Sequence, residues 1–295
     1  MTERIAPLAS ARATLAGFGA ICLWAVLALM TVGTGDVPPF LLTAICFAVA
    51  TLVGAVDMAV RRVPLSVLRQ PWAVWALGVA GLFGYHVLYF VALQNAPPAQ
   101  ASLIAYLWPL LIVLFAALLP GERLRWFHLA GALMGLGGLF VLVGGQLTFA
   151  GIGWGYAAAL ACAFVWSSYS VGSRAFGQVP TAVVTGYCAA TAVLSALLHL
   201  ATEETVWPAS PLAWACAVGL GLGPVGTAFY LWDFAMKRGR IQLLGVASYA
   251  TPVLSILVLV TVGLAAPTWE LALATFLVTA GALVAASDVL RGRSG

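Results

Sequence analysis

Apolar runs of about twenty residues follow one another along nearly the whole chain, separated only by short connections. A helix that crosses the hydrocarbon core of a bilayer needs roughly 20 apolar residues, because each residue advances it by about 1.5 Å. Apolar residues make up 63% of the 295 and charged residues only 7%, against about 25% in a typical soluble domain. This composition excludes a soluble globular fold, a disordered chain and a basic nucleic-acid-binding protein.

The apolar runs predict an all-α membrane protein with ten transmembrane helices. Uninterrupted apolarity favours helices over a closed barrel, whose strands would alternate apolar and polar residues. The connections leave no segment long enough for a soluble domain. The predicted spans are 12–33, 38–60, 72–94, 98–119, 127–144, 151–172, 181–201, 211–236, 241–263 and 268–290.

The charged residues predict the orientation of the chain. With ten spans, all 13 Lys and Arg residues fall on one side, in the two terminal segments or in the loops of that side. The opposite loops carry Asp36, Glu203, Glu204 and Glu270. Basic residues are enriched on the cytoplasmic side of membrane proteins. We therefore expect both termini in the cytoplasm.

The two halves of the chain, 1–150 and 151–295, match each other at a shift of 142 or 143 residues. Each predicted half holds five spans, so the second half would enter the membrane inverted relative to the first. Inverted repeats are typical of secondary transporters, whose substrate sites lie at mid-membrane between the repeats. The matched pairs are Trp24 with Trp166, Pro38 with Pro180, Ala92 with Ala235, Tyr106 with Tyr249, Pro109 with Pro252, Trp126 with Trp269 and Gly138 with Gly281.

Aromatic and polar side chains at mid-depth predict a substrate chamber, because such groups are costly against lipid. Flat rings can stack on another ring or attract an ammonium group, which suits an aromatic or otherwise apolar amino acid. Packing within the bundle is the alternative for any one ring, and a satisfied core histidine is the alternative for His86. The candidates are Trp24, Tyr85, His86, Tyr89, Tyr106, Trp108, Trp166, Ser248 and Tyr249.

Pro109 and Pro252 fall near the middle of the fourth and ninth spans. A proline inside a helix removes one backbone hydrogen bond and kinks the helix. A static kink is one interpretation. A pair of symmetric hinges around the cavity, which lets each half rock, is the other.

No carboxylate lies at mid-span. Asp57, Glu122, Asp233 and Asp288 lie near the predicted cytoplasmic ends beside basic residues, where we expect charge pairs. This absence argues against proton-driven export of organic cations. The five cysteines form no CxxC motif, so neither a metal nor another cofactor is expected. The string Gly221-x-Gly223-x-x-Gly226 lies inside an apolar span with no preceding strand, so it does not predict a dinucleotide site.

The run Tyr230–Arg238, followed by Pro252, and the run Leu118–Glu122 resemble the repeat signature of the EamA type of the drug/metabolite transporter superfamily. The resemblance covers nearly the whole chain. The place in the second half that corresponds to Gly121-Glu122 reads Gly263–Ala266 and lacks the acid. Any strictly symmetric role for Glu122 is therefore in doubt.

Gly84–Phe90 and Tyr106–Pro109 are similar to the aromatic amino acid exporters of the YddG kind within that superfamily. The resemblance implies export of aromatic, and other neutral, amino acids across a bacterial inner membrane, and it implies that the nine candidate residues surround the cavity. A carrier for a purine, an aliphatic amino acid or a drug is one alternative, and a membrane-embedded enzyme is another. The expected partners are a small-molecule substrate and bilayer lipid, with no nucleic acid.

Overall fold

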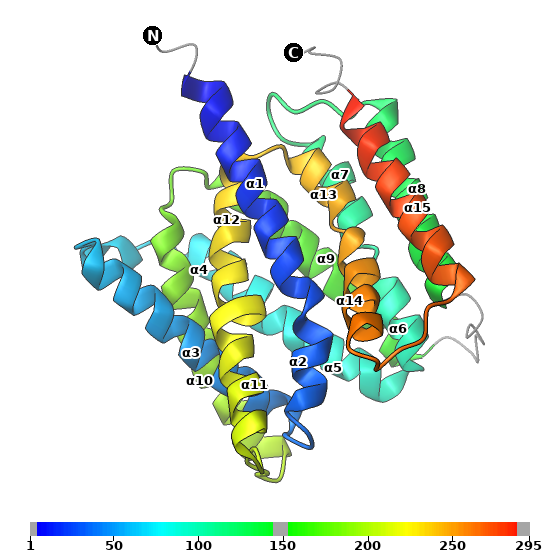
Figure 1. Ribbon diagram of the computed structural model, residues 1–295. Coiled ribbons are helices and arrows are strands. Elements are labelled where there is room, and N and C mark those ends of the chain that lie inside the picture. Colours follow the sequence, from blue (N-terminus) through cyan, green and yellow to red (C-terminus); the bar gives the residue numbers. More distant parts are fainter. Residues whose placement is uncertain (1–4, 144–152, 288–295) are drawn as a thin grey trace.

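The structure is a computed structural model that describes residues 5–143 and 153–287, with side chains described from Ser10 onward (Figure 1). All regular elements of these residues are helices. The first half contains α1 (Ile5–Ala25), α2 (Leu27–Gly33), α3 (Pro39–Val60), η1 (Leu65–Leu68), α4 (Trp72–Val79), η2 (Ala80–Gly84), α5 (Tyr85–Asn95), α6 (Pro98–Ala105), α7 (Trp108–Ala116) and α8 (Trp126–Val143).

The second half follows a similar order, but its first helix is unbroken and its short 3₁₀ turn precedes the second helix instead of following it. Its elements are α9 (Trp154–Ala175), η4 (Thr181–Val183), α10 (Val184–Thr202), α11 (Pro211–Leu222), η5 (Gly223–Thr227), α12 (Ala228–Arg238), α13 (Ile241–Ala247), α14 (Ala250–Thr261) and α15 (Trp269–Ala285). The start of α1 and the end of α15 lie on the same side of the bundle (Figure 1).

Eight helical segments of the described residues are long and apolar enough to cross a membrane, which confirms an all-helical multi-pass protein. Two further predicted spans do not meet that measure. Helix α15 has only 17 described residues. Helix α9 has 22 residues, but it carries Ser167, Tyr169 and Ser170. All three are buried, and they lower the mean hydropathy of α9, whereas Leu160 and Phe164 on its exposed face are apolar. Positions 144, 151–152 and 288–290 of the predicted spans lie outside the described residues.

Irregular turns recur at the spacing of the sequence repeat. The π-helical turns η2 and η5 begin at Ala80 and Gly223, and both lie inside a long apolar helix. Two other helices break before their prolines, at Tyr106–Leu107 and at Ser248–Tyr249. The ring of a helical proline clashes with the carbonyl four residues earlier, which explains why each break precedes its proline. Symmetric irregularities of this kind are typical of functional segments in helices.

The two halves interleave instead of forming separate bundles. Two contacts join helices at equivalent places in the repeat, namely α3 with α10 and α8 with α15, while α7 of the fourth predicted span packs on α13 of the ninth. Two others are exchanged: α1 packs on α12 from the third segment of the second half, and α9 packs on α5 from the third segment of the first half. A two-fold relation between two similar units produces both kinds of contact, those between equivalent helices and those that are exchanged.

The backbones of α8 and α15 approach each other closely at Gly131 and Gly281. A Cβ atom at Gly131 would lie 2.5 Å from the carbonyl oxygen of Gly281, and a Cβ at Gly281 would lie 2.6 Å from that of Gly131. Small residues permit such close contacts between membrane helices. The contact explains the glycine at each of these two positions.

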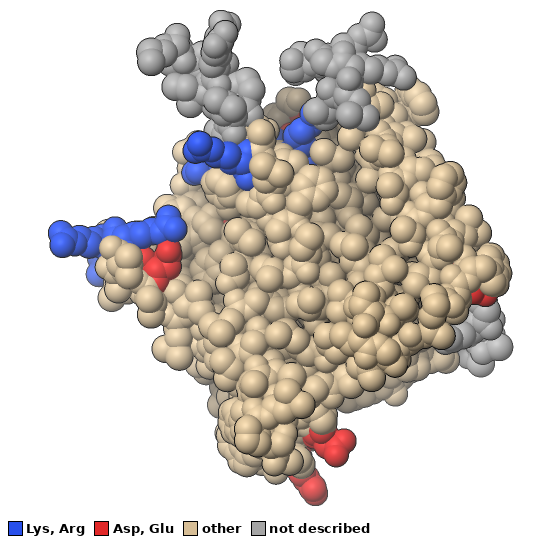
Figure 2. Space-filling view, in the orientation of Figure 1, with Lys and Arg blue, Asp and Glu red and all other residues tan. Residues whose placement is uncertain are grey.

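Charged side chains are sorted between the two ends of the bundle. On the face seen in Figure 2, Lys and Arg gather toward the end that carries both chain termini, which we call the basic end, and none lies at the opposite, acidic end. Three carboxylates form the predicted pairs with basic residues, while Asp288 lies outside the described residues. The pairs are Arg61 with Asp57 at 2.7 Å, Lys237 with Asp233 at 2.8 Å, and Arg174 with Glu122 at 2.5 Å.

Candidate functional site

A cavity of about 990 Å³ lies in the middle of the helical bundle and extends toward its acidic end. Its mouth is lined by Thr34 and Gly35 after α2, by Pro39 at the start of α3, and by Pro98 at the start of α6. None of the described residues that line it carries a formal charge. An ion that leaves water for such a place would have no counter-ion, which costs several kcal/mol. The cavity therefore suits a molecule without net charge.

Tryptophan rings form the inner end of the cavity. Trp24, Trp108 and Trp166 come from α1, α7 and α9, and their ring centroids lie 5.8–6.3 Å apart in edge-to-face arrangements. Trp232 lies behind them, fully buried, and donates its indole N–H to the hydroxyl of Ser170 at 3.0 Å. Edge-to-face pairs at these distances stabilise an aromatic cluster. The cluster provides a rigid apolar surface for a ring.

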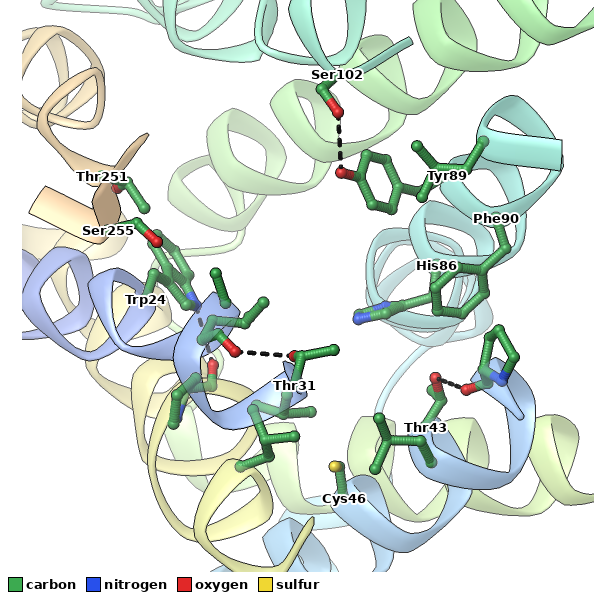
Figure 3. A pocket seen from close by; sticks show the side chains of 18 of the residues that line it. Trp24, Thr31, Thr43, Cys46, His86, Tyr89, Phe90, Ser102, Thr251 and Ser255 are labelled. Atoms are coloured by element: carbon green, nitrogen blue, oxygen red, sulfur yellow. Dashed lines mark hydrogen bonds between the residues drawn. The ribbon is translucent and has the colours of Figure 1, made fainter. Parts of the chain in front are cut away.

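His86 extends from α5 into the cavity (Figure 3). Its Nδ1 lies 2.7 Å from the carbonyl oxygen of Leu82. A carbonyl can only accept a hydrogen bond, so Nδ1 carries the hydrogen, and in the neutral ring Nε2 is then an acceptor. The imidazole is held by Phe47, whose ring centroid lies 5.2 Å away in an edge-to-face contact. His86 thus offers the cavity one fixed hydrogen-bond acceptor.

Hydroxyl groups of the cavity fall into two kinds. Thr31 and Thr43 donate to carbonyls of their own helices, at 2.8 and 2.7 Å, so their hydrogens are already in use. Tyr89 shares a hydrogen bond of 3.3 Å with Ser102 (Figure 3). Thr251 lines the cavity from α14, and its buried hydroxyl has no partner among the described residues. Ser255, one turn further along α14, also lines the cavity.

The structure brings together seven of the nine predicted site residues, namely Trp24, Tyr85, His86, Tyr89, Tyr106, Trp108 and Trp166, and it places Pro252 beside them.

Ser248, Tyr249 and Pro109 do not line the cavity. The Ser248 hydroxyl donates to the carbonyl of Leu244 within its own helix at 2.7 Å. Tyr249 is fully buried against α8, where a Cβ at Gly135 would lie 2.5 Å from its Cδ2. The break before Pro252 rotates these two residues away and presents Thr251 and Ser255 instead.

Phe229 and Phe90 line the cavity although the sequence did not indicate them. The sequence repeat could have indicated Phe229, because it stands 143 residues after His86. In the structure the centroids of these two rings lie 6.4 Å apart. Phe90 follows Tyr89 directly, and no pattern distinguishes it from an ordinary apolar residue of a membrane helix.

The EamA-like transporter family matches the chain twice, over residues 12–144 and 153–287. The chain belongs to this family. Its two matches correspond to the two halves of the sequence repeat. The transporter has no group of three His, Cys, Asp or Glu side chains, among its described residues, that could hold a metal ion.

Three relatives of the transporter are named as exporters. A protein of Ancylobacter novellus named aromatic amino acid exporter YddG is 59% identical over 279 residues, which cover 92% of this chain and 96% of that protein. The YddG of Salmonella typhimurium is 25% identical over 84% of this chain and 87% of its own. A probable terminal-alkyne amino-acid exporter of Streptantibioticus cattleyicolor is 28% identical over 70% of this chain and 71% of its own. A crystal structure with 59% sequence identity matches with a TM-score of 0.88 over 92% of this chain and 96% of that one.

The EamA transporter is closed at its basic end by contacts between its two halves. Arg174 at the end of α9 pairs with Glu122 of the first half, and within its own half it donates to the carbonyls of Met236 and Gly239 at 3.0 and 2.8 Å. Gln242 of α13 donates to the same Glu122 carboxylate at 2.7 Å. The cavity is therefore accessible from the acidic end and sealed at the basic end.

Proposed function

We propose that this transporter exports aromatic amino acids across a bacterial inner membrane and binds them in the central cavity. The observation that carries the proposal is a cavity of about 990 Å³ with aromatic walls and no charged lining residue among those described. A zwitterion has no net charge and can enter such a place more easily than a cation or an anion. The 59% identical exporter of Ancylobacter novellus supports the same substrate class.

The tryptophan cluster and His86 divide the recognition of the substrate between them. The ring of the substrate stacks against Trp24, Trp108 and Trp166, where offset or edge-to-face contacts contribute about 0.5–1.5 kcal/mol each beyond burial. The ammonium group donates to Nε2 of His86, which the bond from Nδ1 to Leu82 leaves as an acceptor. Cation–π attraction to the neighbouring tyrosines adds to this contact.

We further propose ten crossings in two inverted five-helix halves, 1–150 and 151–295, with both termini in the cytoplasm. The charge sorting supports this orientation, because it places the basic end in the cytoplasm. The repeated π-helical turns and the exchanged helix contacts support the two-fold relation. In this orientation the cavity opens outward, and the contacts around Arg174 close it toward the cytoplasm.

Export then requires the opposite state, with the basic end open and the acidic end closed. Pro109 and Pro252 are suited as hinges, since each follows a helix break beside the cavity. Each half can bend at its break while the remainder of its helices stays rigid. Alternating access of this kind is the usual behaviour of transporters built from inverted repeats.

Counterflow into proteoliposomes tests this function. Vesicles are loaded with one unlabelled amino acid, and the entry of labelled L-phenylalanine is followed with and without a proton gradient. We expect tryptophan, tyrosine and phenylalanine to drive entry strongly, and adenine, alanine and an organic cation to drive it weakly. Equal counterflow with adenine or with the cation would contradict the substrate class. A product formed without vectorial movement would indicate an enzyme.

A further inference from the structure

Two hydroxyl groups on α14 form a polar pair in a cavity whose other walls are mainly aromatic. Thr251 and Ser255 are four residues apart, so their side chains lie one above the other on the same face of the helix. Both line the cavity, and Figure 3 shows them across it from His86 and Phe90. Two donors at this spacing can reach the two oxygens of a single carboxylate.

No hydrogen bond within the described part of the chain accounts for the hydroxyl group of Thr251. Thr251 is only 6% exposed, and its Oγ1 has no hydrogen-bond partner in the described part of the chain. A buried polar group without a partner destabilises the state that buries it. Threonine in a helix commonly bonds the carbonyl three or four residues earlier, as Thr31 and Thr43 do here. In the structure the hydroxyl oxygen of Thr251 is buried; a rotation about χ1, which exchanges the methyl and hydroxyl groups of Thr251, would bring it to the cavity surface.

We propose that Thr251 and Ser255 bind the carboxylate group of the substrate. This inference rests on the proposed function and adds the end of the amino acid that the aromatic walls and His86 leave unpaired. His86 is an acceptor and cannot bond a carboxylate oxygen, whereas hydroxyl groups donate to it. The hydroxyl pair belongs to the second half and His86 to the first. A substrate held at both ends therefore connects the two halves that must move against each other.

The test compares L-phenylalanine with phenylalaninamide, which keeps the ring and the amino group but replaces the carboxylate by a neutral amide. Both compete with labelled L-phenylalanine in counterflow. The variants are the double substitution Thr251→Val with Ser255→Ala, and Thr251→Ser, which keeps the hydroxyl. The control is Thr261→Val on the same helix, because the exposed Thr261 hydroxyl bonds the carbonyl of Val258 and lies away from the cavity.

We expect the unaltered protein to prefer the acid over the amide by about tenfold or more, because hydrogen bonds to charged groups are stronger than neutral ones. The double variant should bind the acid about tenfold more weakly. The amide, which accepts only neutral hydrogen bonds and keeps its net positive charge, should lose less, so that the preference for the acid falls several-fold. The Thr251→Ser and Thr261→Val variants should retain the preference for the acid over the amide.

An unchanged preference in the double variant, or no preference in the unaltered protein, would overturn the carboxylate site and leave the proposed function intact. Absence of any aromatic amino acid transport by the unaltered protein would overturn the proposed function and this inference together.

Discussion

A single hydrogen bond decides what His86 can do in the cavity. The bond from Nδ1 to Leu82 fixes the ring and its tautomer, so Nε2 is left as an acceptor for the cavity. An acceptor selects an ammonium group and disfavours an anion. The residue thus contributes specificity without carrying a charge of its own.

His86→Leu and His86→Gln separate this role from packing. The Leu variant fills a similar volume without an acceptor, and we expect its transport of L-phenylalanine to fall about ten- to a hundredfold at low substrate concentration. The amide oxygen of Gln reaches a position near that of Nε2, so this variant should keep clearly more activity. Initial rates in proteoliposomes measure the difference. Equal rates in the two variants would show that the acceptor has no part in binding.

At the scale of helices, two features determine how the transporter holds together and bends. The glycine contact between α8 and α15 joins the last segments of the two halves with their backbones close together. The breaks before Pro109 and Pro252 interrupt the helices beside the cavity. The first feature stabilises one pair of helices, and we propose that the second permits motion in others.

Gly281→Ala tests the helix contact. The added methyl would lie 2.6 Å from the backbone oxygen of Gly131, so the helices must separate, at a cost of about 1–3 kcal/mol. We expect the melting temperature in detergent to fall by several degrees. Gly137→Ala on α8 is the control, because nothing lies within 4 Å of its Cβ position and alanine favours a helix. Similar melting temperatures for the two variants would contradict the contact.

Pro252→Ala tests the hinge. Alanine removes the ring that clashes with the carbonyl of Ser248 and allows the helix to continue, which stabilises it by up to about 3 kcal/mol. Because its helix is straighter and stiffer, the Pro252→Ala variant should transport L-phenylalanine several-fold more slowly than the unaltered protein. Its melting temperature should be higher. Pro211→Ala is the control, since Pro211 lies in the first turn of α11, where proline disturbs no helical bond. A normal transport rate in Pro252→Ala would favour a static kink.

At the scale of the whole molecule, the closed basic end and the open acidic end correspond to one of the two states that the proposed alternating access requires. The pair of Arg174 with Glu122 connects the two halves at the closed end, and the bonds of Arg174 to Met236 and Gly239 hold it in place within its own half. Their loss should therefore shift the population toward the state that opens there. A partly buried ion pair contributes more than an exposed one, because solvent screens it less.

Arg174→Gln should raise the reactivity of a cysteine at position 173, introduced by Ser173→Cys in a background without the native cysteines. Ser173 is buried near this closed end, so labelling with an impermeant maleimide in inverted vesicles reports opening toward the cytoplasm. We expect a several-fold increase. Arg61→Gln is the control, because it removes an ion pair with Asp57 whose side chains are 72% and 52% exposed. No increase in Arg174→Gln, or an equal one in Arg61→Gln, would argue against this closure.

The sequence by itself determined the features that depend on local composition. Membrane helices follow from apolar length, the charge sorting follows from the positions of Lys and Arg, and the repeat is visible as matched residues at a common shift. The seven aromatic and polar residues that meet in the cavity, His86 among them, could be nominated from their depth alone.

Only the tertiary structure decided which neighbours on a helix face the cavity. Successive residues of a helix differ by about 100° in direction, so a break of two residues re-orients everything after it. The break at Ser248–Tyr249 buries these two residues and presents Thr251 and Ser255, which no spacing in the sequence indicated. The partners of a buried group are likewise set by distant segments: Glu122 meets Arg174 and Gln242 only because the two halves interleave.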